Sequence, residues 1–129
     1  MSLTLYLIND YANRLQAIYK DMDSCNLLRL ADLTPYENSM NRFVYLCRNN
    51  APLNMIFNQL KDACARLYKT AAGMQDDCIG GGVIGIITSA FSDNLANATL
   101  GYNGQKYQHL EEVKEELSNL FDEMNRLPF

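Results

Sequence analysis

The sequence contains no tryptophan, three prolines and a single histidine, His109. A metal site of the helical-bundle type needs Glu-x-x-His motifs on facing helices, and one histidine cannot supply two of them. None of the four cysteines belongs to a CxxC pair of the kind that binds zinc. We therefore expect no metal and no cofactor, and we interpret His109 as a solvated residue near the start of a helix.

Basic residues are in the minority, which gives a net charge of −4 and a pI of about 4.8. Nucleic acids require patches of Lys and Arg, so this balance argues against a nucleic-acid partner. The cysteines could form disulfides, but in a chain that is 48% hydrophobic the plainer interpretation is four small buried apolar residues.

Signals of catalysis are also absent. The glycine run 80–82 is followed by no Lys-Ser/Thr pair and preceded by no predicted strand, so it does not match a phosphate-binding loop. No cysteine has a local nucleophile signature, although a pairing of a cysteine with His109 stays open. We expect a protein that is not an enzyme.

Neither terminus carries a targeting signal. The apolar residues near the N-terminus have no basic region ahead of them, and no hydrophobic tail ends the sequence. We therefore expect a cytoplasmic protein without a membrane anchor in this chain. With 129 residues, we expect one domain that spans 1–129.

Apolar residues recur at helical spacing along most of the chain, and no window shows the alternation of a strand. Turn and capping signals divide this pattern: Thr34-Pro35-Tyr36-Glu37 reads as a capping box, Asn49-Asn50 and Gly73 as helix ends, and 101–104 as a turn. The predicted helices are 2–22, 25–33, 34–48, 52–73, a helix from about Gly82, and 105–126.

The stretch 78–92 has no charged residue. Its 15 residues are fewer than the roughly 20 that cross a membrane, and its apolar positions fall on nearly every side of a helix, which indicates a buried helix. Glycines crowd its start, where a backbone must turn tightly or another backbone must approach. We predict an all-α fold, a single bundle of five to six or more helices around this central hydrophobic helix.

Three stretches resemble motifs of the Bcl-2 family of apoptosis regulators. Leu27, Ala31 and Asp32 match the third homology motif, in which a leucine is followed by a small residue and an aspartate. Asp76 lies five residues before Gly81 and the apolar run 83–87, as in the first homology motif, which opens the family's buried central helix. Asp10-Tyr11 and Arg14-Leu15 resemble the fourth motif with one residue fewer. The order and separations agree over about the whole chain, and the length suits the compact, sequence-divergent viral members.

The chain also departs from the family pattern. Gly82 stands where the family has an arginine that pairs with the aspartate of a bound ligand helix, and Gly80 replaces a tryptophan. No second homology motif follows the last helix. The lost contact is charge-assisted and can contribute roughly 1.5–3 kcal/mol. Apolar contacts would then carry the binding, or another base, Arg42, Arg48 or Arg66, would replace the arginine.

The resemblance implies an anti-apoptotic protein that sequesters the amphipathic death-promoting helix of pro-apoptotic Bcl-2 relatives in a hydrophobic groove. If the chain is viral, this host–virus interaction would take place in the host cell cytoplasm. A second copy could cover the groove, so a homodimer is a further expectation. The expected groove residues are Met40, Phe43, Val44, Cys47, Ile56, Leu60, Leu67, Gly81, Gly82 and Ile84.

Two other interpretations stay open at this point. Each apolar groove residue, taken singly, is better explained as core, and a tight loop before a buried helix explains Gly80 to Gly82 but not Gly85. The chain could also be an acidic helical inhibitor or immunity-type protein that masks a basic surface of its target. That function would use the acidic face Glu111, Glu112, Glu115, Glu116 and Glu123, and its binding would weaken strongly with salt.

Overall fold

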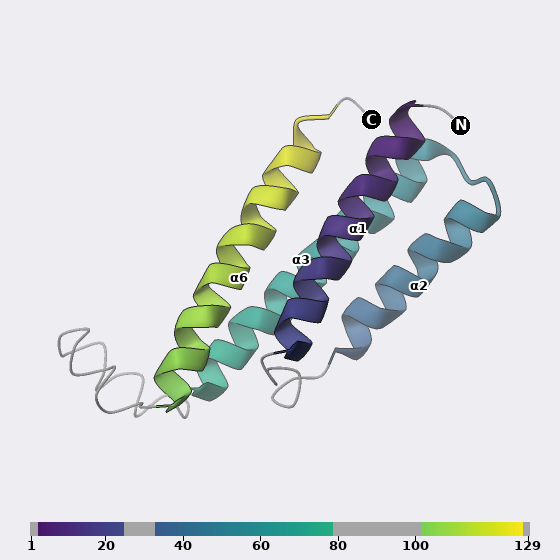
Figure 1. The fold of residues 1–129 in the computed structure, drawn as a ribbon. Coiled ribbons are helices and arrows are strands. Elements are labelled where there is room, and N and C mark those ends of the chain that lie inside the picture. Colours follow the sequence, from purple (N-terminus) through teal and green to yellow (C-terminus); the bar gives the residue numbers. More distant parts are fainter. Residues whose placement is uncertain (1–2, 25–32, 79–101, 128–129) are drawn as a thin grey trace.

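The computed structural model describes residues 3–24, 33–78 and 102–127, which form helices and connecting turns with no strand (Figure 1). The all-helical prediction is confirmed for these residues. None of their helices is long and apolar enough to cross a membrane. The four helices are α1 (Leu3–Ser24), α2 (Thr34–Arg48), α3 (Leu53–Cys78) and α6 (Tyr102–Asn125).

Helix α3 lies at the centre of the arrangement and packs against α1, α2 and α6. Helices α2 and α6 flank it on opposite sides, and α1 lies across the space between them (Figure 1). A short turn joins the end of α2 to the start of α3, so these two helices form an antiparallel hairpin (Figure 1).

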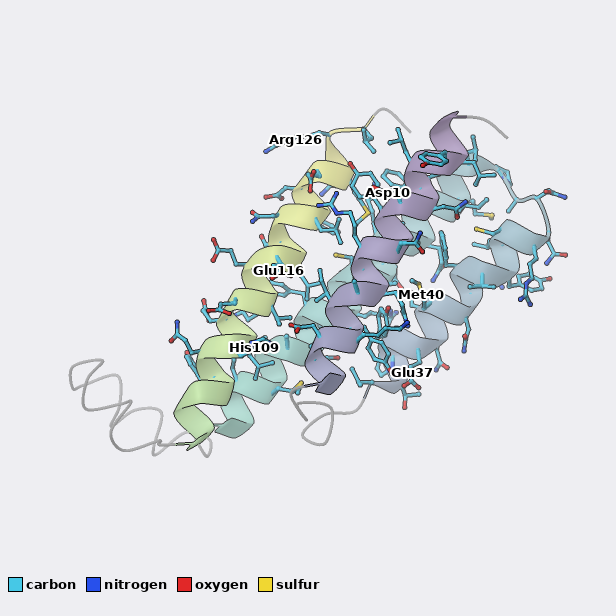
Figure 2. The ribbon with its side chains drawn as sticks, in the orientation of Figure 1. Asp10, Glu37, Met40, His109, Glu116 and Arg126 are labelled. Carbon is cyan, nitrogen blue, oxygen red and sulfur yellow. The ribbon has the colours of Figure 1, made fainter. Side chains whose placement is uncertain are left out.

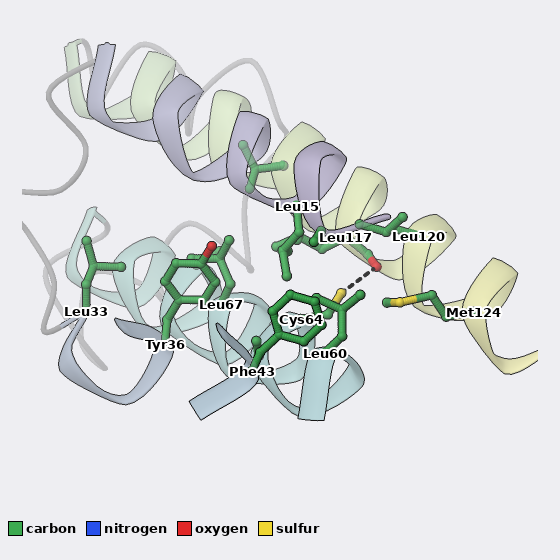
Figure 3. Close-up of a cluster of buried hydrophobic side chains, with 14 of the residues drawn as sticks. Leu15, Leu33, Tyr36, Phe43, Leu60, Cys64, Leu67, Leu117, Leu120 and Met124 are labelled. Carbon is green, nitrogen blue, oxygen red and sulfur yellow. Dashed lines mark hydrogen bonds between the residues drawn. The ribbon is translucent and has the colours of Figure 1, made fainter. Parts of the chain in front are cut away.

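The core is built from the apolar stripes of all four helices (Figure 3). Leu15, Leu60, Leu67 and Leu117 are completely buried in it, and burying a leucine side chain contributes about 1.5–3 kcal/mol. Cys64 is also buried and carries a free thiol, as expected of a small apolar residue. The apolar spacing therefore predicted most inward positions correctly, but Val44 and Tyr68, which share that spacing, are exposed.

The α2–α3 turn follows the sequence signals closely. Asn49 caps the end of α2, and its side-chain amide donates to the Tyr45 carbonyl at 2.8 Å. Asn50 adopts a positive φ of 53°, a conformation that asparagine tolerates better than most residues. The carbonyl of Pro52 then accepts the first helical bond of α3, from the Ile56 amide at 3.1 Å.

The start of α2 differs from the predicted capping box. Thr34 is the first helical residue, and Leu33 occupies the N-cap position without a side-chain cap bond. The Leu33 side chain has no oxygen to offer and packs into the core instead. Its carbonyl accepts from the Glu37 amide at 2.9 Å, which closes the first turn.

Two predicted helix boundaries were wrong. Gly73 does not end α3, which continues to Cys78, because Met74 and Gln75 are buried beyond it. That packing outweighs the cost of about 1 kcal/mol for a glycine inside a helix. Residues 102–104, predicted as part of a turn, are helical instead, since α6 begins at Tyr102. The predicted helices at 25–33 and from Gly82 lie outside the described residues, apart from Leu33.

Candidate functional site

A groove of about 850 Å³ runs along the outside of the α2–α3 hairpin. Its lining residues come from both helices. We call it the α2–α3 groove. Its lining residues are Thr34, Pro35, Asn38, Ser39 and Arg42 from α2, and Met55, Asn58, Gln59, Asp62 and Arg66 from α3.

The floor of the groove is a hydrogen-bonded cluster that joins the two helices. The Ser39 hydroxyl, which is buried, donates to Asp62 Oδ2 at 2.6 Å. The Gln59 amide nitrogen donates to the same hydroxyl at 2.8 Å and reaches the Ser39 carbonyl at 3.2 Å. These bonds satisfy a polar group that would otherwise be costly to bury, and they fix the spacing of the walls.

The neighbours of Asp62 stabilise its negative charge. Arg66, one turn later on α3, donates from Nε to Asp62 Oδ2 at 2.7 Å. Partial burial raises the pKa of Asp62, but the hydrogen bonds from Ser39 and Arg66, with the charge of Arg66, outweigh it, so the pKa lies below its ordinary value. Asp62 therefore stays ionised at neutral pH, and Arg66 has used one of its five N–H donors on it.

Arg42 provides a second guanidinium on the opposite wall. It lies over the ring of Tyr45, 5.6 Å from the ring centre, and both side chains are exposed. Met55 adds an exposed apolar side chain to the α3 wall. The groove thus combines a polar floor, two arginines and two apolar residues, Pro35 and Met55. This arrangement is suited to an elongated ligand that carries both carboxylates and apolar groups.

Of the expected groove residues that the structure describes, none lines the α2–α3 groove. Phe43, Ile56, Leu60 and Leu67 are buried in the core and contact other helices. Met40 and Cys47 are half-buried against the core, and Met40 lies on α2 on the side toward α1 (Figure 2). Val44 is exposed.

The side chains of the remaining predicted residues lie outside the part of the chain that the structure describes. Asp76 is in the last turns of α3, but its side chain is not among those described. The other groove positions, Gly81, Gly82 and Ile84, and the motif positions Leu27, Ala31 and Asp32 fall in the ranges 79–101 and 25–32.

Sequence reasoning missed most of the groove lining. Arg42 and Arg66 were named as possible substitutes for the motif arginine, and the structure brings both to one groove. Ser39 and Asp62 were not singled out. A signal existed for each, because Ser39 is a polar residue within the apolar stripe of α2, and Asp62 and Arg66 have the i,i+4 spacing of a helical ion pair.

No family model, curated protein or solved structure matches this chain.

The acidic face of α6 is partly used within the molecule. Glu111 Oε2 accepts from Gln75 on α3 at 2.6 Å, and Glu123 pairs with Arg14 on α1 at 2.7 Å. Glu112, Glu115 and Glu116 are exposed, and Glu116 lies along the middle of α6 (Figure 2). Fewer glutamates therefore face solvent without an internal partner than the sequence suggested.

His109 lies near the start of α6, as predicted, but its side chain is partly buried and makes polar contacts, so it is not simply solvated. Its Nε2 lies 2.9 Å from Asp21 Oδ2, so it joins the start of α6 to the end of α1. Its Nδ1 lies 3.9 Å from Glu112 one turn along α6. Among the side chains that the structure describes, no group of His, Cys, Asp and Glu residues could hold a metal ion.

Proposed function

We propose that the chain binds an amphipathic helix of a partner protein in the α2–α3 groove. On the strength of the Bcl-2 motifs, the partner is the death-promoting helix of a pro-apoptotic Bcl-2 relative, and the chain is an anti-apoptotic protein with a Bcl-2-like fold that keeps this helix sequestered. The observation that carries the proposal is a groove between these two helices with Arg42 and Arg66 on facing walls.

The dimensions of the groove support a helical ligand. Its α3 wall runs from Met55 to Arg66, roughly 16 Å at 1.5 Å per residue, which is three helical turns. Ligand residues at i, i+4 and i+7 span about 10 Å, so the groove contacts all three. Met55 receives an apolar residue of the ligand, and the uncharged Asn38 and Asn58 contact its polar edge.

The arginines supply the contact that Gly82 removes from the family motif. An aspartate of the ligand helix receives charge-assisted hydrogen bonds from Arg42, which makes no ion pair in the described part of the chain, and from the remaining donors of Arg66. Asp62 already holds Arg66 in place, so little side-chain freedom is lost on binding. Each such contact can contribute roughly 1.5–3 kcal/mol.

Calorimetric titration with a panel of death-promoting helix peptides tests this function. We expect saturable one-to-one binding to at least one peptide. Arg42→Glu and Arg66→Glu should each weaken it about tenfold or more, equivalent to about 1.4 kcal/mol. Lys69→Glu is the matched control, because Lys69 is exposed on α3 outside the groove and its replacement changes the charge equally.

The peptide provides the complementary variant. Replacing its aspartate with asparagine should weaken binding to the wild-type chain and have little further effect on Arg42→Glu, as expected for two groups in contact. If no peptide binds to the folded protein, or if Lys69→Glu weakens binding as much as the groove variants, the proposal is wrong.

The second candidate function, masking of a basic surface by α6, rests on the exposed glutamates Glu112, Glu115 and Glu116. It predicts that a triple replacement by glutamine abolishes binding to a basic target, while Arg42→Glu has no effect. The internal use of Glu111 and Glu123 makes this surface smaller, and the groove is therefore the preferred site.

A further inference from the structure

A second hollow lies on the seam between α3 and α6, apart from the α2–α3 groove. We call it the α3–α6 pocket. Each helix contributes three residues at the same spacing. They are a buried residue, the residue that follows it, and one residue a helical turn later. The pocket has a volume of about 240 Å³ and is lined by Cys64, Ala65 and Tyr68 from α3 and by Leu117, Ser118 and Phe121 from α6.

The shape of the pocket follows from the sizes of these side chains. Ala65 and Ser118 are small and exposed, so they leave a space on the seam. Tyr68, which is 39% exposed, and Phe121, which is half-buried, form its aromatic walls. A ring bound between them would contact two aromatic side chains, which prefer edge-to-face or offset arrangements with a third ring.

The floor of the pocket is uncharged. Cys64 and Leu117 are buried there, and the Cys64 thiol donates to the Leu117 carbonyl at 3.5 Å (Figure 3). Burial raises the pKa of Cys64 to about 12, so the thiol stays protonated at neutral pH. The floor therefore favours an apolar group over an ion and does not offer a thiolate for covalent attachment.

Lys114, a cation beside the pocket, already has other partners. Lys114 lies 5.7 Å from the ring centre of Tyr68, donates to Gln75 Oε1 at 2.9 Å and lies 3.7 Å from Glu111. A carboxylate on a ligand would have to approach Glu111 to reach this ammonium group. A neutral ligand meets no such repulsion.

We propose that the α3–α6 pocket binds a neutral, single-ring aromatic molecule. An apolar cavity of about 150 Å³ accommodates benzene, whereas drug-sized ligands occupy about 300–1,000 Å³. The volume of this pocket lies between the two, so one ring with a small substituent fills it. This site is independent of the function proposed for the α2–α3 groove.

Fluorobenzene is a suitable probe, because its fluorine signal and the leucine methyl groups can both be followed by NMR. We expect saturable binding that shifts the methyl signals of Leu117 and leaves those of Leu33, on the other side of the core (Figure 3), nearly unchanged. Ala65→Leu fills the pocket from an exposed position and should weaken binding about tenfold or more, the factor that hydrophobic pockets show for a small mismatch. Gln108→Leu adds the same side chain elsewhere on α6 and should leave binding unchanged.

The variants must keep the fold, which far-UV circular dichroism and thermal unfolding establish. Ser118→Leu fills the pocket from the other helix and replaces Ala65→Leu if that variant does not fold. The proposal is overturned if the titration does not saturate, if Leu33 shifts as much as Leu117, or if a folded pocket-filling variant binds as tightly as the wild type.

Discussion

Ser39 shows how one polar residue shapes the candidate site. It occupies an inward position of α2 between Tyr36 and Phe43, and it is buried. A buried hydroxyl is tolerated only with hydrogen-bond partners, and Asp62 and Gln59 provide them. The hydrogen bonds that the buried Ser39 hydroxyl needs thus arrange the groove floor, and Asp62, one of its partners, also positions Arg66.

Asp62→Asn should lower the free energy of unfolding in a pH-dependent way. The pKa of Asp62 is depressed in the folded state, so its charged form contributes stability above the unfolded pKa, near 4, which is lost as the pH falls through the folded pKa. At pH 7 we expect a loss of about 1 kcal/mol, modest because Asp62 and Arg66 are both nearly half exposed. Urea unfolding at pH 7, 5 and 3 measures it.

Glu116→Gln is the control for this experiment, since Glu116 is an exposed carboxylate on α6. Its effect should stay near zero at each pH. The explanation would be wrong if the difference between wild type and Asp62→Asn were as large at pH 3 as at pH 7.

At the scale of the helix, Gly73 is a weak point within α3. It is exposed, and a Cβ atom added to it would meet nothing within 4 Å. Gly73→Ala should therefore stabilise the protein by about 0.5–1 kcal/mol, because alanine restricts the unfolded chain and favours the helix. Thermal or urea unfolding measures this change.

Asn50→Ala is the informative comparison, because Asn50 has a positive φ in the α2–α3 turn. The same kind of replacement should destabilise there by about 1 kcal/mol, since alanine is strained in that conformation. Equal effects of the two variants would mean that α3 does not continue through Gly73 in solution.

The helices show which parts of the structure a sequence can predict. Apolar periodicity located α1, α2, α3 and α6, because the pattern depends only on neighbours along the chain. The same periodicity could not distinguish residues of the core from residues of a groove. Phe43 and Leu60 have the spacing of inward-facing residues, and in the structure both are in the core. The position of the groove depends on which helices pack together. The end of α3 depends on the burial of Met74.

At the scale of the whole molecule, charge is unevenly distributed. The hairpin residues from 38 to 61 include Arg42, Arg48 and Lys61 and no acidic residue, whereas α6 carries six acidic residues. Helices α2 and α6 lie on opposite sides of α3 (Figure 1). A homodimer that pairs two α2–α3 grooves would bring arginines of like charge together, which is unfavourable.

Association of copies is therefore expected to be of the head-to-tail kind, with the acidic face of α6 on the hairpin of the next copy. Such an interface is heterologous and does not close by itself. Static light scattering across a concentration series should show an average mass that rises without a plateau at low salt. At about 0.5 M salt, where exposed charges are screened beyond roughly 4–5 Å, it should show the monomer of 14.6 kDa.

The outcome also tests the homodimer expected from the sequence. A closed dimer held by apolar contacts would level off at twice the monomer mass and persist at high salt, because hydrophobic contacts do not weaken with screening. Arg42→Glu together with Arg48→Glu should abolish head-to-tail association but would relieve repulsion in a groove-to-groove dimer. The two arrangements thus predict opposite effects of one double variant, so its average mass at low salt distinguishes them.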